Sequence, residues 1–199
     1  MYVIRPAVPA DADGITRVID HRCTHHLVRH DELVRNDGDL IRRLLTHPGE
    51  SRDRVWVFTD ETAARDRLTI SDEAPLVACL TLTERLPHWS LWTREECAEP
   101  SLSIDSLYTD PAPEQRRTGW MMHCWVVDHV ARTYRQAEWV RCVVAHPRVM
   151  RYMRDQWGWE YVRSGPGADG SAAHLLQHRP EAKPGLAALI TTGQPTSAL

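Results

Sequence analysis

The feature that most limits the fold of this chain is a strand-like segment joined by a proline-containing turn to a long helical segment. Leu102 to Thr109 is rich in residues that favour strands, and Gly119 to Arg135 has a helical pattern. Asp110-Pro111-Ala112-Pro113 must interrupt the strand, because proline lacks a backbone N–H donor. The order strand, turn, helix predicts an α/β protein.

The end of this turn is Arg116-Arg117-Thr118-Gly119, directly before the helix. The first N–H groups of a helix have no intrahelical partner, and the helix dipole adds positive potential there, so such a site suits a diphosphate. The two arginines would add charge to it. The alternative is an ordinary turn with two solvated arginines.

Further segments on both sides have the patterns of strands and helices. Val, Leu and Thr are frequent in the predicted strands, and two of the predicted helices begin at a proline, Pro9 and Pro147. The strands are expected at 2–6, 54–59, 76–83, 139–144, 159–163 and 172–177, and the helices at 9–23, 33–45 and 147–156. Residues 87–100 are expected to form a loop over one end of the sheet.

The size and charge of the chain restrict its class. A chain of 199 residues with 42% hydrophobic residues suits one core, so we predict a single domain over residues 1–180 and a mobile tail over 181–199. The formal net charge is −3, with acidic and basic residues mixed, which argues against nucleic acid or an anionic membrane surface as the partner.

The composition also indicates a compartment. No apolar run reaches the roughly 20 residues of a membrane span, and the first residues lack a signal-peptide layout. The five cysteines are scattered without a CxxC pair, which argues against disulfides and a zinc site. We expect a cytoplasmic protein, and the near-exclusive use of Arg over Lys hints at a bacterial source.

Three groups of residues carry a family resemblance. Ile4-Arg5-Pro6-Ala7 with Pro9-Ala10-Asp11-Ala12, then Arg116-x-x-Gly119, and finally Val140 to Pro147 followed by Trp157-Gly158-Trp159 occur in this order. They resemble, over about residues 2 to 178, the first strand and helix, the diphosphate signature and the last strand-helix segment of the GNAT superfamily of N-acyltransferases. The resemblance implies the GNAT fold: a twisted, mixed, mostly antiparallel sheet with helices on both faces.

The resemblance also implies a reaction and a cofactor. It implies transfer of an acetyl or other small acyl group from acyl-CoA to a primary amine of a small metabolite or amino acid, without a metal. The pantetheine arm would lie where the strands 102–109 and 139–144 part. Its implied contacts are the backbone of Leu107, Tyr108 and Thr109, and the diphosphate contacts are Arg116, Arg117, Thr118, Gly119, Trp120, Met121 and, on the later helix, His146.

Three positions depart from the family pattern. Met121 stands where the signature has Gly or Ala, which limits close approach of a phosphate. The turn is about two residues longer than usual, and His146 replaces the usual Asn before proline. The departures keep two rivals open: a GNAT-fold binding or regulatory module without catalysis, and a transferase with a donor other than a CoA thioester.

The proton-transfer groups follow from the same resemblance. The position of the usual tyrosine acid falls on Met153, and its neighbour Tyr152 is our candidate for protonating the thiolate; the alternative is a structural tyrosine. Asp105, on the strand beside the expected thioester, is our candidate base, with a solvated or arginine-paired aspartate as the alternative. Glu84, at the end of the preceding strand, is the competitor.

The remaining candidates concern the acceptor and metal ions. Trp89 and Trp92 would line an acceptor pocket with Glu84, and Glu95, Glu96 and Glu99 would attract an amine; alternatively the tryptophans cap the core or form a dimer contact. The pairs His21/His25 and His26/His30 have ligand spacing but no supporting motif, so we expect no metal. Cys124 and Cys142 are expected in the core. A homodimer is compatible with the sequence.

Overall fold

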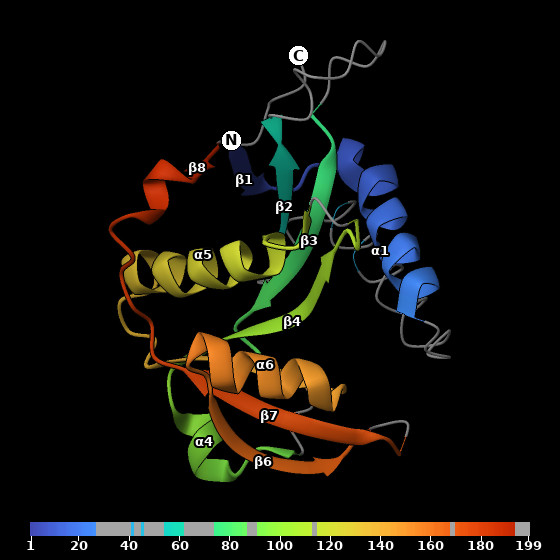
Figure 1. The fold of residues 1–199 in the computed structure, drawn as a ribbon. Coiled ribbons are helices and arrows are strands. Elements are labelled where there is room, and N and C mark those ends of the chain that lie inside the picture. Colours follow the sequence, from blue (N-terminus) through green and yellow to red (C-terminus); the bar gives the residue numbers. More distant parts are fainter. Residues whose placement is uncertain are drawn as a thin grey trace. The chain divides into compact units, whose positions relative to one another are not determined.

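Eight strands form one mixed sheet in the computed structural model (Figure 1). The structure describes residues 1–26, 41, 45, 54–61, 74–86, 91–112, 115–167 and 170–193. The strand order is β6 (Glu160–Pro166), β7 (Ala172–His178), β5 (Trp139–Val144), β4 (Ser101–Thr109), β3 (Leu76–Thr83), β2 (Arg54–Asp60), β1 (Tyr2–Pro6) and β8 (Ile190–Thr192).

The chain divides into two compact units. The first comprises Met1–Thr81, Ser106–Met121 and Gly185–Leu199, and the second Leu82–Asp105 and Met122–Pro184. In the first unit β1 pairs with β2 in antiparallel and with β8 in parallel register. Residues 2–4 and 190–192, far apart in the sequence, are therefore neighbours in this unit.

Helix α1 (Ala12–His26) covers the apolar side of the first unit. It follows a 3-10 turn at Pro9–Asp11, where the Asp11 carboxylate accepts hydrogen bonds from Arg5 (2.7 Å) and from the N–H of Val8 (2.8 Å). This fixes the direction in which the helix leaves β1. The buried residues of this core are Ile15, Val18, Ile19, Ile41, Leu45, Val55, Val57, Leu76 and Cys79.

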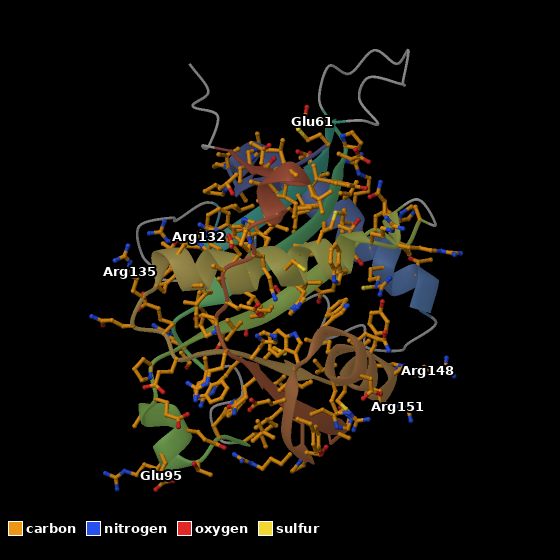
Figure 2. All side chains as sticks on the ribbon, turned by 60° about the vertical axis from the view of Figure 1, so that its left-hand side comes forward. Glu61, Glu95, Arg132, Arg135, Arg148 and Arg151 are labelled. Atoms are coloured by element: carbon orange, nitrogen blue, oxygen red, sulfur yellow. The ribbon has the colours of Figure 1, made fainter. Side chains whose placement is uncertain are left out.

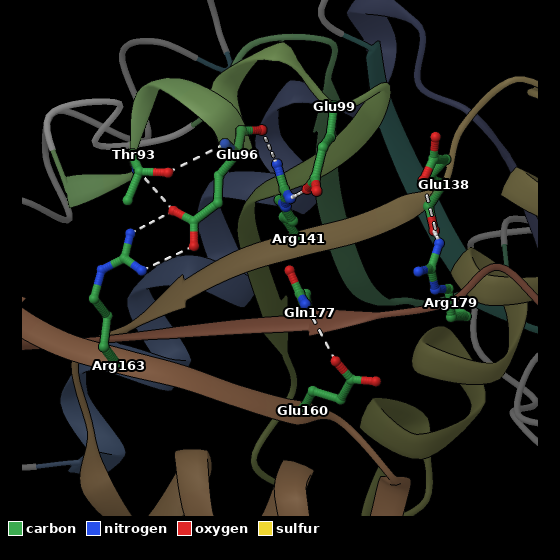
Figure 3. A network of polar contacts seen from close by, with 9 residues as sticks. All are labelled: Thr93, Glu96, Glu99, Glu138, Arg141, Glu160, Arg163, Gln177 and Arg179. Carbon is green, nitrogen blue, oxygen red and sulfur yellow. Dashed lines mark hydrogen bonds and ion pairs between the residues drawn. The ribbon is translucent and has the colours of Figure 1, made fainter.

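The second unit is built on β5, β7 and β6, which pair in antiparallel register. Helices α4 (Arg94–Ala98) and α6 (Pro147–Trp157) lie on opposite sides of these strands (Figures 1 and 3). Helix α6 ends at Gly158, whose φ of +73° is a left-handed conformation that favours glycine. Helix α5 (Thr118–Thr133) begins in the first unit and continues in the second.

Most predicted elements are confirmed within a few residues at each end. Two expectations were wrong. Residues 87–100 were predicted as a loop, but 94–98 form α4, because Thr93 and Glu96 cap its start reciprocally. Part of the predicted mobile tail is ordered, since Leu186 and Ile190 are buried and residues 190–192 pair with β1.

The structure does not test two other predictions, the helix at 33–45 and the single domain. The predicted helix at 33–45 lies almost entirely outside the described residues, although positions 41 and 45 are helical. A single domain over 1–180 stays a prediction. None of the helices in the described part of the chain is long and apolar enough to span a bilayer.

Candidate functional site

Strands β4 and β5 are paired over only part of their length. Their parallel register runs from Ser101–Trp139 to Ile104–Cys142 and ends there. Strand β4 nevertheless continues to Thr109 and β5 to Val144. The backbone of β4 beyond residue 104 therefore takes no part in this ladder, and Asp105, which is exposed, is the first residue after it.

The last part of β4 belongs to the first unit and leads into the turn. Leu107, Tyr108 and Thr109 are half-buried, and Tyr108 packs against the core beneath α1. The N–H of Asp110 donates to the carbonyl of Val77 (2.8 Å), which holds the end of β4 on β3. The position of the turn is thereby fixed relative to the sheet.

The start of α5 is anchored by a buried polar network. Thr118 is fully buried, and its hydroxyl donates to Oε1 of Gln115 (3.1 Å). Nε2 of Gln115 donates to the carboxylate of Asp60 on β2 (3.2 Å). The hydroxyl of Tyr2 donates to Oε1 of Gln115 (3.4 Å). Burial, and secondarily Asp60, raises the pKa of Tyr2 above its ordinary value, so its hydroxyl stays a donor.

Beyond this network, the helix start presents backbone donors and charge. The first backbone N–H described as bonded along α5 is that of Met121, which donates to the carbonyl of Arg117 (3.0 Å). The side chains of Arg116 and Arg117 are exposed. The amides that precede Met121 are those that a helix start leaves for an external acceptor.

Met121, which departs from the signature, and its neighbour Trp120 differ in exposure. The Met121 side chain is buried, with 5% of its surface exposed, whereas Trp120 is 41% exposed. Met121 therefore fills the interior, and the bulky side chain at the surface of this helix start is that of Trp120.

At the start of α6, His146 is the N-cap residue. Its Nδ1 accepts a hydrogen bond from the N–H of Arg148 (3.1 Å), and Pro147 follows at the first helical position. Further along α6, Met153 is buried, while Tyr152 is 53% exposed and its ring meets Trp157 edge-on at 5.1 Å. The side chain that α6 turns into the interior is thus the methionine.

Comparison with solved structures shows the fold to which this chain is similar. An acetyltransferase of the GNAT family from Listeria monocytogenes matches with a TM-score of 0.63 at 11% identity, over 89% of this chain and 94% of that one. The aminoglycoside acetyltransferase AAC(6')-Ib, solved with coenzyme A and kanamycin, matches with a TM-score of 0.60 at 13% identity, over 90% and 95%. Arabidopsis thaliana NAA60, solved with acetyl-CoA, matches with a TM-score of 0.60 at 15% identity, over 90% of this chain and 99% of that one.

The chain has the GNAT fold. The fold predicted from the sequence is thereby confirmed. At the level of sequence alone, no protein-family model and no curated protein matches. The segments that carry the sequence resemblance lie in β1 and the start of α1, at the start of α5, and in β5 and α6.

Within this GNAT fold, the predicted acceptor residues are placed as follows. Trp92 is buried and lies under the guanidinium of Arg141, 4.9 Å from its ring centroid. This packing agrees with the alternative that the tryptophan caps the core. Trp89 lies outside the described residues. Glu84 is exposed and shares the lining of a cavity with Ser101, at the beginning of β4.

Two acidic residues, Glu96 in α4 and Glu99 directly after it, are paired with arginines. Glu96 forms an ion pair with Arg163 of β6, and Glu99 forms one with Arg141 of β5 (Figure 3). The hydrogen bond from Arg163 lowers the pKa of Glu96 to about 2. Arg163 also donates to the carbonyl of Leu91 (2.8 Å), so it holds both α4 and Leu91, which precedes the helix, on the sheet.

Neither Arg141 nor Arg163 is among the site residues predicted from the sequence. Arg141 lies inside the apolar run Trp139 to Val144, and a charged residue within a predicted buried strand was the signal that could have revealed it. Arg163 carried no comparable signal, because its partner on α4 is distant in sequence.

The metal and cysteine expectations concern residues away from this segment. In the part of the chain that the structure describes, no group of three or more His, Cys, Asp or Glu residues is placed to hold a metal ion. Nδ1 of His21 lies 3.6 Å from Asp110, and the side chains of His25, His26 and His30 lie outside the description. Cys124 and Cys142 are buried as expected, and burial raises the pKa of both thiols, which disfavours a reactive thiolate.

Proposed function

We propose that the protein is an N-acyltransferase that moves an acetyl or other small acyl group from acyl-CoA to a primary amine of a small metabolite or amino acid. The observation that carries the proposal is the end of the β4–β5 ladder at Ile104–Cys142, followed by a strand that leads directly to the N-terminus of α5. A strand segment outside its ladder offers backbone groups to an amide-containing ligand, and a helix start offers N–H donors to a diphosphate.

The cofactor contacts that we propose lie in the first unit, except that of His146, which belongs to the second. The backbone of Leu107 to Thr109 would pair with the amides of the pantetheine arm. The amides of residues 117–120 would hold the diphosphate, and the exposed Arg116 and Arg117 would neutralise its charge. Trp120 and Met121 would contact the cofactor through their backbone, and His146 would contribute from the start of α6.

The chemistry needs a base and an acid besides the cofactor. We assign the base to Asp105, which would accept the proton of the amine as its nitrogen attacks the thioester carbonyl. The tetrahedral intermediate then collapses, the C–S bond breaks, and the leaving thiolate takes a proton. We assign Tyr152, an exposed residue of α6, as the donor of that proton.

A second candidate function is favoured by one specific observation. The residue that α6 buries at the expected position of the acid is Met153, which has no proton to give, and Tyr152 is turned to the surface beside Trp157. A GNAT-fold module that binds a CoA ester without turning it over would show this arrangement. A transferase with a different donor is the third possibility, and it would fail to bind CoA.

Binding and turnover separate these candidates. Acetyl-CoA at about 100 times a micromolar Kd stabilises the folded protein by about 2.7 kcal/mol, so the thermal midpoint should rise, whereas acetyl phosphate at equal concentration serves as the control that lacks the nucleotide. A panel of amines and amino acids is then tested for release of free CoA thiol. Binding with thiol release supports the enzyme, and binding without release supports the module. An unchanged thermal midpoint at millimolar acetyl-CoA contradicts both the enzyme and the CoA-binding module, and favours a transferase whose donor is not a CoA thioester.

A further inference from the structure

A buried cation lies on β5, in the second unit. Arg141 is fully buried, and it stands directly opposite Ser103 of β4 in the parallel register. Its side chain points towards α4, as Figure 3 shows. A buried charge is costly unless its donors are satisfied by partners.

The partners of Arg141 satisfy only part of its guanidinium. One terminal nitrogen donates to the carboxylate of Glu99 and the other to the carbonyl of Glu96. A guanidinium has five N–H donors, and the Nε of Arg141 has no acceptor among the described residues. The buried hydroxyl of Ser103 likewise has no described hydrogen-bond partner.

The carboxylate that pairs with Arg141, that of Glu99, also borders a cavity. The cavity has a volume of about 900 Å³, and its wall includes Glu84, Arg85, Glu99, Leu102, Tyr134 and Arg135. The side chain of Glu99 is 43% exposed, although its partner is fully buried. Glu99 therefore stands between the cavity and the cation, and solvent reaches it from the cavity side.

We propose that this cavity is a binding site for a small carboxylate, which replaces Glu99 at the guanidinium of Arg141. Arg85 and Arg135 line the cavity together with Glu84, whereas Arg141 lies buried behind Glu99. With Glu99 turned away, the guanidinium of Arg141 would be opened to the ligand. A planar guanidinium binds a carboxylate through two parallel hydrogen bonds. Leu102 and the ring of Tyr134 give the body of the ligand an apolar wall.

This site is separate from the proposed cofactor site. The cavity is lined by the first residues of β4, Ser101 and Leu102, whereas the proposed pantetheine contacts begin at Leu107. Five residues of extended strand span about 17 Å. The carboxylate site therefore does not depend on whether the protein binds CoA.

The test uses succinate as the probe and compares the wild-type protein with Glu99→Gln. Glutamine keeps the size of the side chain but removes the charge that competes for Arg141. In the wild-type protein Glu99 occupies Arg141 for most of the time, and the apparent affinity for a ligand is reduced in proportion to the fraction of molecules in which Arg141 is vacant. We therefore expect calorimetry to show that succinate binds about tenfold more tightly to Glu99→Gln than to wild type. Succinamide, the neutral analogue, should bind neither protein at matched ionic strength.

Two exposed arginines, Arg132 in the last turn of α5 and Arg135 just after its end, provide a matched control. Arg135 lines the cavity, whereas Arg132 pairs with Asp128 on its own helix, and both project from the end of α5 in Figure 2. Arg135→Gln should weaken succinate binding to Glu99→Gln several-fold, and Arg132→Gln should leave it unchanged. The proposal is overturned if succinate binds neither protein, if Glu99→Gln binds no more tightly than wild type, or if inorganic phosphate binds while succinate does not.

Discussion

The indole N–H of Trp159 donates a hydrogen bond of 2.9 Å to Nδ1 of the buried His123. This bond requires a histidine nitrogen without a proton. The His123 ring also stacks on Trp157, with centroids 5.1 Å apart and planes 9° from parallel. Burial first, and then the neighbouring His178 and Lys183, lower the pKa of His123 from 6.5 to about 3.

The stability of the fold should therefore fall as the pH drops below 6.5. In the unfolded chain His123 binds a proton below its ordinary pKa, whereas in the folded chain it stays neutral down to about pH 3. Within this window the free energy of unfolding decreases by about 1.4 kcal/mol per pH unit. His123→Gln keeps an acceptor for Trp159 without titrating, so urea denaturation between pH 6.5 and 5 should show a shallower decline than for wild type or for the exposed His21→Gln. Equal slopes would contradict the assignment.

Removing Arg163 should loosen α4 from the sheet. Arg163→Met loses both the ion pair with Glu96 and the bonds to the carbonyl of Leu91. We expect faster amide exchange over residues 93–98 in hydrogen-exchange mass spectrometry. Arg154→Met, which breaks an exposed ion pair with Asp155, should leave that segment unchanged. Unaltered exchange in Arg163→Met would show that other contacts hold the helix.

The ion pair of Glu96 also predicts a response to acid. Its folded pKa of about 2 lies below the ordinary 4.5, so the stabilisation is complete above pH 4.5 and is lost as the pH falls from there towards 2. Glu96→Gln should remove this component, and denaturation curves at pH 5 and pH 3 should differ less for the variant than for wild type. The same difference in both proteins would mean that the carboxyl titrates normally.

Local sequence patterns predicted the strands and helices well, but they did not predict which side of each element every side chain lies on. The apolar run from Trp139 to Val144 predicted β5, and Pro147 with Gly158 predicted the limits of α6. Which of Tyr152 and Met153 turns inward depends on one residue of helical phase, and the structure buries Met153. The partners of Arg141 come from α4, more than 40 residues away, so no local pattern contained them.

Exchange of the proposed base should separate catalysis from binding. Asp105→Asn keeps the shape of the side chain but cannot accept the amine proton, so we expect kcat to fall by about 10² to 10⁴. The Kd for acetyl-CoA should stay within twofold. Asp20→Asn, at an exposed position of α1, is the control for a surface charge change. A kcat within a factor of about three of wild type would reject the role of Asp105.

The arginines before α5 should act on cofactor affinity and not on stability. Both side chains are exposed, and each would contribute charge-assisted hydrogen bonds to the diphosphate. The double variant Arg116→Gln/Arg117→Gln should raise the Kd for CoA about tenfold or more, less so at high salt, with an unchanged thermal midpoint. Arg54→Gln, exposed at the first residue of β2, should change neither quantity. Equal Kd values for the double variant and wild type would remove both arginines from the cofactor site.

The most direct test is a crystal structure of the protein with CoA. We predict that the diphosphate accepts hydrogen bonds from backbone amides within residues 117–120, and that the pantetheine amides pair with the backbone of Leu107 to Thr109. Cofactor density elsewhere, or crystals grown at millimolar CoA in which these amides contact no ligand, would contradict the account.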